Sequence, residues 1–212
     1  MKKILLIGDS IRAGYDKYVK MAFKEVAEVY YPMDNCRFAS YIVRGIGEWK
    51  ERLDCGDDVD LVYWNAGLWD NLIMVDGEHH TPLNIYKMYI GRICNMIKIL
   101  FPDAKIIFAT STPVQEESSV VWAKRYNSDT ELYNAAATEV VKEHGGDVDD
   151  LYELTKNAPS SNYSDGTHFY TKEGTRLLAN HVIHTIEMCL EIQAEELDYD
   201  ELFSETKNVI GI

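Results

Sequence analysis

A serine that directly follows the first apolar segment has the position that a nucleophile requires. Residues 3–7 predict a buried strand, and Gly8, Asp9 and Ser10 come immediately after it. If a helix begins there, its first backbone N–H groups point toward incoming negative charge. A serine hydroxyl is a weak nucleophile and needs a histidine base, which a carboxylate orients. A simpler interpretation is that Asp9 or Ser10 only caps the helix.

The chain offers two Asp-x-x-His pairs as partners for this serine. Asp165 and His168 lie in a Ser/Asn/Gly-rich loop just before the last long helical pattern, whereas Asp76 and His79 lie in a polar loop in the middle of the chain. Their identical spacing does not discriminate between them, and both loops can reach the same edge of a sheet. We favour the first pair, because a helix that starts at Thr171 would fix its loop.

Motifs for several other chemistries are missing. The sequence contains no G-x-S-x-G elbow, no G-x-x-x-x-G-K-[ST] loop and no G-x-G-x-x-G fingerprint. A metal cluster of His79 and His80 with Asp70, Asp76 and Glu78 can be imagined, but adjacent histidines point in different directions and no H-x-H or H-x-x-x-H pattern occurs. We therefore expect no metal and no organic cofactor.

Short apolar strands alternate with helical patterns along the chain. Strands are expected at 3–7, 27–31, 60–64 and 105–110, with a weak fifth at 147–152. Helices are expected at 15–26 and 41–53. Thr81-Pro82 should open a third that runs to residue 100. A capping box at Ser128–Glu131 should open a fourth that stops before Gly145, and Thr171 a fifth that runs to Ile192. This alternation predicts an α/β fold, with a parallel sheet covered on both faces and ligands bound at the carboxyl ends of the strands.

Composition and charge narrow the class of protein further. The 212 residues are 46% hydrophobic and 26% charged, which suits one ordinary globular domain, and the net charge is -14. Such an acidic chain repels phosphate backbones and anionic membranes, so we expect no nucleic-acid or membrane partner. The four cysteines form no C-x-x-C and predict reduced thiols, and the short apolar run after Met1 resembles no secretion signal. We expect a cytoplasmic protein.

The end of the chain differs in composition from the rest. We divide the sequence into a single domain over residues 1–192 and an acidic C-terminal tail over residues 193–212. The tail is expected to be a solvated helix face that runs into a mobile acidic end. A weaker interpretation uses Leu197, Leu202 and Phe203 as an oligomer contact, and the oligomeric state stays open.

Two motifs near the two ends resemble one family. The segment 7–15, Ile-Gly-Asp-Ser-Ile-Arg-Ala-Gly-Tyr, is similar to the first block of the GDSL, or SGNH, hydrolases, and Asp165-Gly166-Thr167-His168 with Gly174 is similar to their last block. This resemblance implies a flavodoxin-like three-layer sandwich with a central, mostly parallel five-stranded sheet. It also implies an ester hydrolase in which Ser10 attacks the carbonyl, His168 takes the proton and Asp165 orients the imidazole.

The middle blocks depart from the usual pattern of that family. After the third strand, the family's G-x-N-D is replaced by a segment in which Asn65 precedes the glycine and Asp70 follows it. By resemblance, the oxyanion hole consists of the N–H of Ser10, the amide of Asn65 and a backbone N–H after the second strand. The segment after the second strand, residues 34–40, has no glycine. The last donor is then the backbone N–H of Arg37 or Phe38, and we assign Arg37. Asn65 could instead only brace its loop.

The substrate is suggested by aromatic residues in the expected rim loops. We assign substrate-binding positions to Asp9, Trp69 and Trp122, and Trp64, Tyr126 and Tyr163 also fall in or near these loops. The commonest explanation for any one of the tryptophans is simple core packing. The segment 112–127 could form a lid. Together these features favour a small-molecule ester as the partner, with short acyl (acetyl) groups removed from a carbohydrate or another small soluble ester. The alternatives are a lipolytic esterase or thioesterase for longer acyl chains, and a non-catalytic binding domain.

Overall fold

One parallel sheet of five strands runs through the centre of the molecule. The computed structural model describes residues 1–118 and 123–206. Its strands are β1 (Lys2–Ile7), β2 (Ala27–Tyr30), β3 (Leu61–Trp64), β4 (Lys105–Ala109) and β5 (Asp147–Asp149). They are ordered β2-β1-β3-β4-β5, and every neighbouring pair is parallel. All five expected strands are present, the fifth shortened because a helix begins at Leu151.

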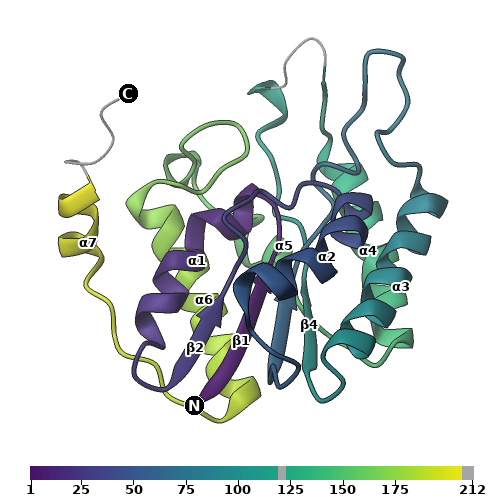
Figure 1. The fold of residues 1–212 in the computed structure, drawn as a ribbon. Coiled ribbons are helices and arrows are strands. Elements are labelled where there is room, and N and C mark those ends of the chain that lie inside the picture. Colours follow the sequence, from purple (N-terminus) through teal and green to yellow (C-terminus); the bar gives the residue numbers. More distant parts are fainter. Residues whose placement is uncertain (119–122, 207–212) are drawn as a thin grey trace.

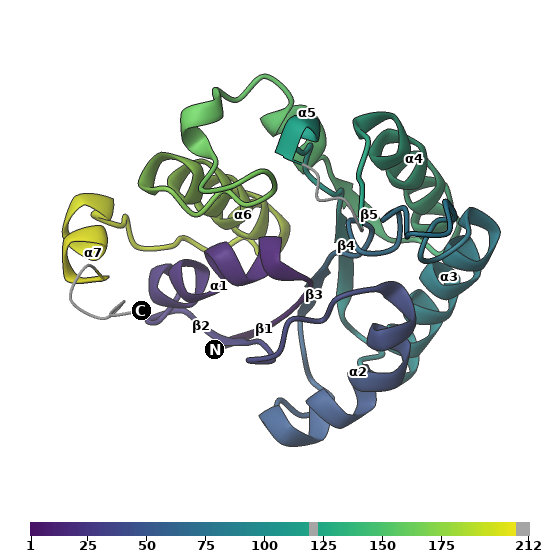
Figure 2. The same ribbon diagram turned by 90° about the horizontal axis from the view of Figure 1, so that it is seen from above.

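Helices cover both faces of this sheet (Figures 1 and 2). They are α1 (Ser10–Ala22), α2 (Ala39–Leu53), α3 (Leu83–Leu100), α4 (Asn127–Glu143), α5 (Leu151–Thr155), α6 (Lys172–Leu190) and α7 (Tyr199–Thr206), with 3-10 turns η1 (Glu116–Ser118) and η2 (Ser160–Asn162). One core contains side chains of α1 and α6, and the other contains side chains of α2, α3 and α4. The expected three-layer α/β sandwich is confirmed.

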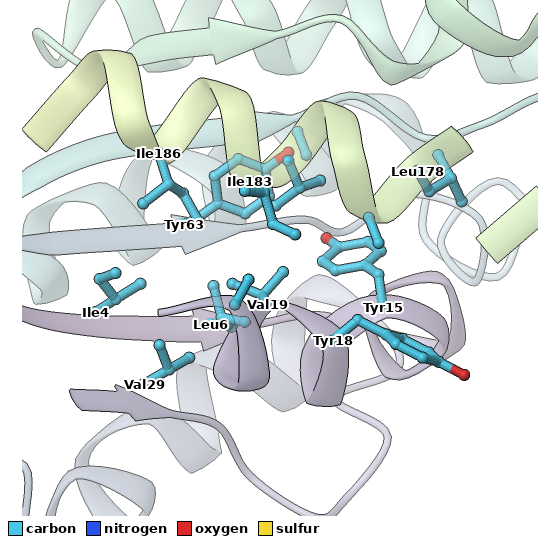
Figure 3. Close-up of a cluster of buried hydrophobic side chains, with 14 of the residues drawn as sticks. Ile4, Leu6, Tyr15, Tyr18, Val19, Val29, Tyr63, Leu178, Ile183 and Ile186 are labelled. Carbon is cyan, nitrogen blue, oxygen red and sulfur yellow. The ribbon is translucent and has the colours of Figure 1, made fainter. Parts of the chain in front are cut away.

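The first strand shows why the sheet needs helices on both sides. Ile4 and Leu6 belong to the core beneath α1 and α6, which Figure 3 shows in close-up, and Leu5 and Ile7 belong to the opposite core. All four side chains are fully buried. Because successive residues of a strand point to opposite faces, an unbroken apolar strand requires an apolar partner on each face.

One helix start matches its sequence signal in full, and two differ from theirs. Thr171 caps α6 through a hydrogen bond from the N–H of Gly174 to its Oγ1 at 3.1 Å. The helix expected after Thr81 is present as α3, but it begins at Leu83, so Pro82 rather than Thr81 is its N-cap residue and no side chain caps it. The capping box proposed at Ser128 is wrong, because α4 begins one residue earlier, at Asn127. The Asn127 side chain bonds both the N–H and the carbonyl of Val114, so a contact with the preceding loop sets this start.

The acidic segment after α6 packs on the domain in its described part. The ring of Tyr18 in α1 lies 5.6 Å from that of Tyr199 and 5.9 Å from that of Phe203, centroid to centroid. Leu197, Leu202 and Phe203, considered above as an oligomer contact, are partly buried against this chain's own core. The described part of this segment therefore packs on the domain through its apolar side chains, while acidic side chains such as Glu196 and Asp198 are exposed.

The strand order places the loops after β1 and β3 beside each other. The chain passes from β1 outward to β2 and then returns to β3 on the other side of β1. Crevices form at such a reversal, at the carboxyl ends of the strands. The residues that follow Ile7 and Trp64 are therefore brought together.

Within the described ranges, no helix is long and apolar enough to cross a bilayer.

Candidate active site

Ser10 is the first residue of α1, and the residue before it is the helix cap. The Asp9 Oδ1 accepts a hydrogen bond from the N–H of Ile11 at 2.9 Å. The capping interpretation thus holds for Asp9 and leaves the Ser10 hydroxyl available for another contact. Asp9 is fully buried, so the substrate-binding position assigned to it is wrong. Burial raises the pKa of this carboxyl, and contacts with the Asn65 side chain and the Ile11 N–H only partly oppose the shift.

A continuous chain of contacts joins Ser10 to the last loop before α6. His168 Nε2 lies 2.8 Å from Ser10 Oγ, and His168 Nδ1 lies 2.7 Å from Asp165 Oδ2. The hydroxyl, the imidazole and the carboxylate thus stand in the order that nucleophilic catalysis requires. The structure brings together these three residues from opposite ends of the chain.

Local hydrogen bonds hold Asp165 and His168 in this arrangement. Asp165 Oδ1 accepts from the N–H groups of Thr167 and His168, at 2.7 and 2.9 Å. Although partial burial raises the Asp165 pKa, these bonds and the His168 side chain outweigh it and keep that pKa below its ordinary value. Gly174 lets the loop approach α6, because a Cβ there would lie 2.2 Å from the carbonyl oxygen of Asn162.

The competing pair Asp76 and His79 has other partners. His79 Nε2 lies 3.3 Å from Asp129 Oδ2, and its ring packs on Tyr133. Asp76 Oδ1 accepts from the N–H of Glu78 in a local turn. Among the described residues, neither side chain contacts Ser10. Geometry therefore separates two pairs that sequence spacing could not.

Asn65 lies directly against the glycine of the first block. Its backbone N–H donates to the carbonyl of Ile7 at 3.0 Å, and its side chain is 2% exposed. A Cβ on Gly8 would lie 1.9 Å from Asn65 Oδ1. Residue 8 must therefore be glycine for the Asn65 amide to reach the serine loop.

The loop after β2 corrects the assignment of Arg37 to the oxyanion hole. Arg37 adopts a φ of 50°, and its N–H donates to Asn35 Oδ1 at 2.8 Å. This turn directs the N–H toward Asn35, so it is not available to a substrate. The Cys36 N–H binds the Gly8 carbonyl at 3.0 Å and holds the loop beside Ser10. Phe38, the other candidate, has no hydrogen-bond partner for its N–H within the described residues.

Arg12 is a buried residue of the site that the sequence analysis missed. It is 1% exposed, forms an ion pair with Asp16, and donates to the carbonyls of Pro32 at 3.0 Å and Asp34 at 2.7 Å. Arg12 thereby links the start of α1 to the loop after β2. The sequence did contain a signal for this role, because Arg12 is a charged residue on the apolar face of the first helix.

Tyr170 is a second residue that the sequence analysis missed. Its hydroxyl donates to the Ser10 carbonyl at 2.5 Å, and its ring stacks on that of His168, centroid to centroid at 4.7 Å. Gly14 makes room for it, because a Cβ there would lie 2.7 Å from the Tyr170 ring. Tyr170 therefore braces both Ser10 and His168.

The tryptophans of the expected rim have different positions. Trp64 is fully buried in the core and packs on Phe108 at 4.9 Å, so for this residue core packing holds and a place on the rim does not. Trp69 is partly buried on the loop that carries Asn65. Trp122 lies outside the described residues. Tyr163 packs against Phe169, and Tyr126 is 39% exposed.

Asp70 connects the loop after β3 to the second helix. Both of its carboxylate oxygens lie within 3.2 Å of the Ala39 N–H, at the beginning of α2. Burial raises the pKa of Asp70 to about 7, although hydrogen bonds from Thr81 and Ala39 oppose the shift. Asp70 is thus a structural partner of the helix that follows Phe38.

The raised pKa of Asp70 predicts a pH-dependent stability. Between about pH 4 and pH 7 the unfolded carboxyl loses its proton while the folded one keeps it, so the free energy of unfolding falls as pH rises. One pKa unit corresponds to about 1.4 kcal/mol, so we expect a fall on the order of 1–3 kcal/mol that Asp70→Asn removes. Urea unfolding of both proteins at pH 4.5, 5.5 and 7 measures it; parallel curves would contradict it.

Comparisons with known proteins agree with this geometry at the level of the fold. No family model and no curated protein matches the chain. A lipase/acylhydrolase from Enterococcus faecalis superposes with a TM-score of 0.70 at 20% identity, over 93% of this chain and 100% of that one. The acetyl xylan esterase AlAXEase has a TM-score of 0.67 at 15% identity, with coverages of 87% and 99%. A GDSL-like lipase from Bacteroides thetaiotaomicron has a TM-score of 0.65 at 18% identity and covers 88% of each chain.

This chain therefore shares its fold with these lipases and esterases, and the similarity spans most of the chain in each comparison. The resemblance that rested on two short end motifs is confirmed for the architecture.

Proposed function

We propose that this protein is a serine ester hydrolase with Ser10, His168 and Asp165 as its catalytic residues. The observation that carries the proposal is the contact chain from Ser10 Oγ through the imidazole to Asp165 Oδ2, at 2.8 and 2.7 Å. The neighbouring folds belong to lipases and esterases, which supports the same class of reaction. Ester hydrolysis by such a set needs no cofactor.

In the proposed mechanism, His168 Nε2 removes the hydroxyl proton as Ser10 attacks the ester carbonyl. The developing oxyanion accepts hydrogen bonds from the N–H of Ser10, the amide of Asn65 and the N–H of Phe38. His168 then protonates the leaving alcohol, and a water activated by the same imidazole releases the acid. Asp165 keeps Nδ1 protonated, so that Nε2 faces the serine.

We propose short acyl esters, such as acetyl groups on a carbohydrate, as the substrates. The acetyl xylan esterase among the neighbours supports this choice, and the net charge of -14 opposes binding to anionic lipid surfaces. The lipase/acylhydrolase neighbour favours longer acyl chains as a second candidate. A p-nitrophenyl series from acetate to decanoate separates the two, and release of acetate from a panel of acetylated sugars tests the first directly.

A fluorophosphonate probe tests whether the protein is catalytic at all. The proposal expects one covalent label, located on Ser10 by peptide mapping, and no label on Ser10→Ala. A non-catalytic binding domain would remain unlabelled. The other serines provide the internal control, since within residues 1–118 and 123–206 no serine hydroxyl except that of Ser10 contacts an imidazole.

Substitution of the oxyanion donor should lower turnover more than binding. Asn65→Ala removes one preorganised donor, so we expect kcat to fall roughly 10²–10³-fold. KM should change little, because the oxyanion exists only near the transition state. Steady-state kinetics with p-nitrophenyl acetate measures both constants. A raised KM with unchanged kcat would mean that Asn65 binds substrate or shapes its loop.

A further inference from the structure

Arg125 lies against the loop that carries the oxyanion donor. The backbone of its neighbour Lys124 pairs with Ile73, with N–H···O distances of 2.9 and 3.0 Å, which holds this part of the chain onto the loop after β3. Arg125 Nε then donates to the carbonyl of Leu68 at 2.5 Å. Leu68 is three residues after Asn65. The guanidinium is thus fixed above the carboxyl edge of the sheet.

The guanidinium has more donors than the protein uses. An arginine side chain carries five N–H donors in a planar fork. Within the described ranges, Nε is the only one with a hydrogen-bond acceptor, and the side chain is only partly exposed. The other guanidinium nitrogens are not among the described buried atoms that lack a partner, so they face solvent and can donate to an anion.

The loop that holds Arg125 also reaches the serine loop. Leu68, whose carbonyl accepts from Arg125 Nε, is three residues after Asn65, and a Cβ on Gly8 would lie 1.9 Å from Asn65 Oδ1. No ion pair joins Arg125 to Asp9 among the described residues, although the Asp9 carboxyl opposes the lowering of the Arg125 pKa by burial. A cation with unused donors is therefore held on the loop that contacts the serine loop.

We propose that Arg125 binds a carboxylate of the substrate, so that the enzyme acts preferentially on esters that carry a carboxylate close to the scissile bond. This inference rests on the proposed ester hydrolysis. The planar fork of arginine matches a carboxylate with two parallel hydrogen bonds, which a neutral ester cannot supply. The chain has a net charge of -14, which repels anionic substrates. A preference for them therefore has to arise from local contacts rather than from the overall field.

Two matched substrate pairs test the preference on each side of the ester. For the acyl side, 4-nitrophenyl hemisuccinate is compared with its methyl ester; for the alcohol side, 4-acetoxy-3-nitrobenzoate is compared with its amide. The selectivity is the ratio of kcat/KM for the anionic member to that for the neutral member. We expect the wild-type ratio to exceed that of Arg125→Met by at least about tenfold in one of the pairs, with Arg125→Lys between them.

Arg44→Met is the matched control, because Arg44 is an exposed arginine of α2 whose ion-pair partner is Glu48. Its selectivity should equal that of the wild type. If Arg125→Met lowers kcat/KM for both members of each pair equally, Arg125 only holds the Leu68 loop and the proposal is overturned. Equal wild-type rates within both pairs would overturn it as well. The proposed ester hydrolysis fails separately, if the wild type hydrolyses none of the four compounds.

Discussion

Ser10→Ala should abolish ester hydrolysis while leaving the fold intact. We expect kcat to fall on the order of 10⁴-fold or more, as in other triads that lose one member. The Ser10 hydroxyl contacts His168, and Asp9 rather than Ser10 caps α1, so the free energy of unfolding should change by no more than about 1 kcal/mol. Hydrolysis of p-nitrophenyl acetate and urea unfolding measure the two quantities.

The control for this prediction is a serine with a similar chemical character but no imidazole. Ser111 has a buried hydroxyl with no hydrogen-bond partner among the described residues, so Ser111→Ala should keep near-normal turnover. Near-normal turnover in Ser10→Ala would refute the proposed mechanism. A large loss of stability in that variant would instead show that Ser10 has a structural role.

His168→Ala and His79→Ala should differ by at least about a hundredfold in turnover. We expect His168→Ala to lower kcat by at least roughly 10³-fold, because its Nε2 is the group that contacts the Ser10 hydroxyl. His79→Ala should lower kcat by less than about tenfold, since His79 faces Asp129 and Tyr133. Asp165→Asn should be severe as well, because it presents the wrong imidazole tautomer to Ser10.

The two histidine variants act as controls for each other. Both remove an imidazole that pairs with an aspartate and packs on a tyrosine ring, so a general effect of losing such a group would appear in both. If His79→Ala were the crippling change and His168→Ala were mild, the assignment of the site would be wrong even if ester hydrolysis were confirmed. Circular dichroism of both variants excludes unfolding as the cause.

The local elements were predictable because their signals are short-range. An apolar run that is covered on both faces predicts that Ile4, Leu5, Leu6 and Ile7 are all buried and enter the two cores alternately. Thr171 caps its helix with its own side chain. The start of α4 was mispredicted because its determinant is a contact between Asn127 and Val114, thirteen residues away. The burial of Trp64 depends on packing against Phe108 in the neighbouring strand, a contact that its own segment does not specify.

Residue order was sufficient to predict the alternation of strands and helices and to identify the two end motifs that contain Ser10, Asp165 and His168. These are properties of a few consecutive positions, where periodicity and capping act. Three-dimensional packing was needed to show which Asp-x-x-His pair meets the serine and that the Arg37 N–H turns toward Asn35. It was also needed to show that Arg12 and Tyr170 brace the site. Those relations join residues far apart in the chain, and the strand order β2-β1-β3-β4-β5, which brings the loops to one edge, is not encoded in any single segment.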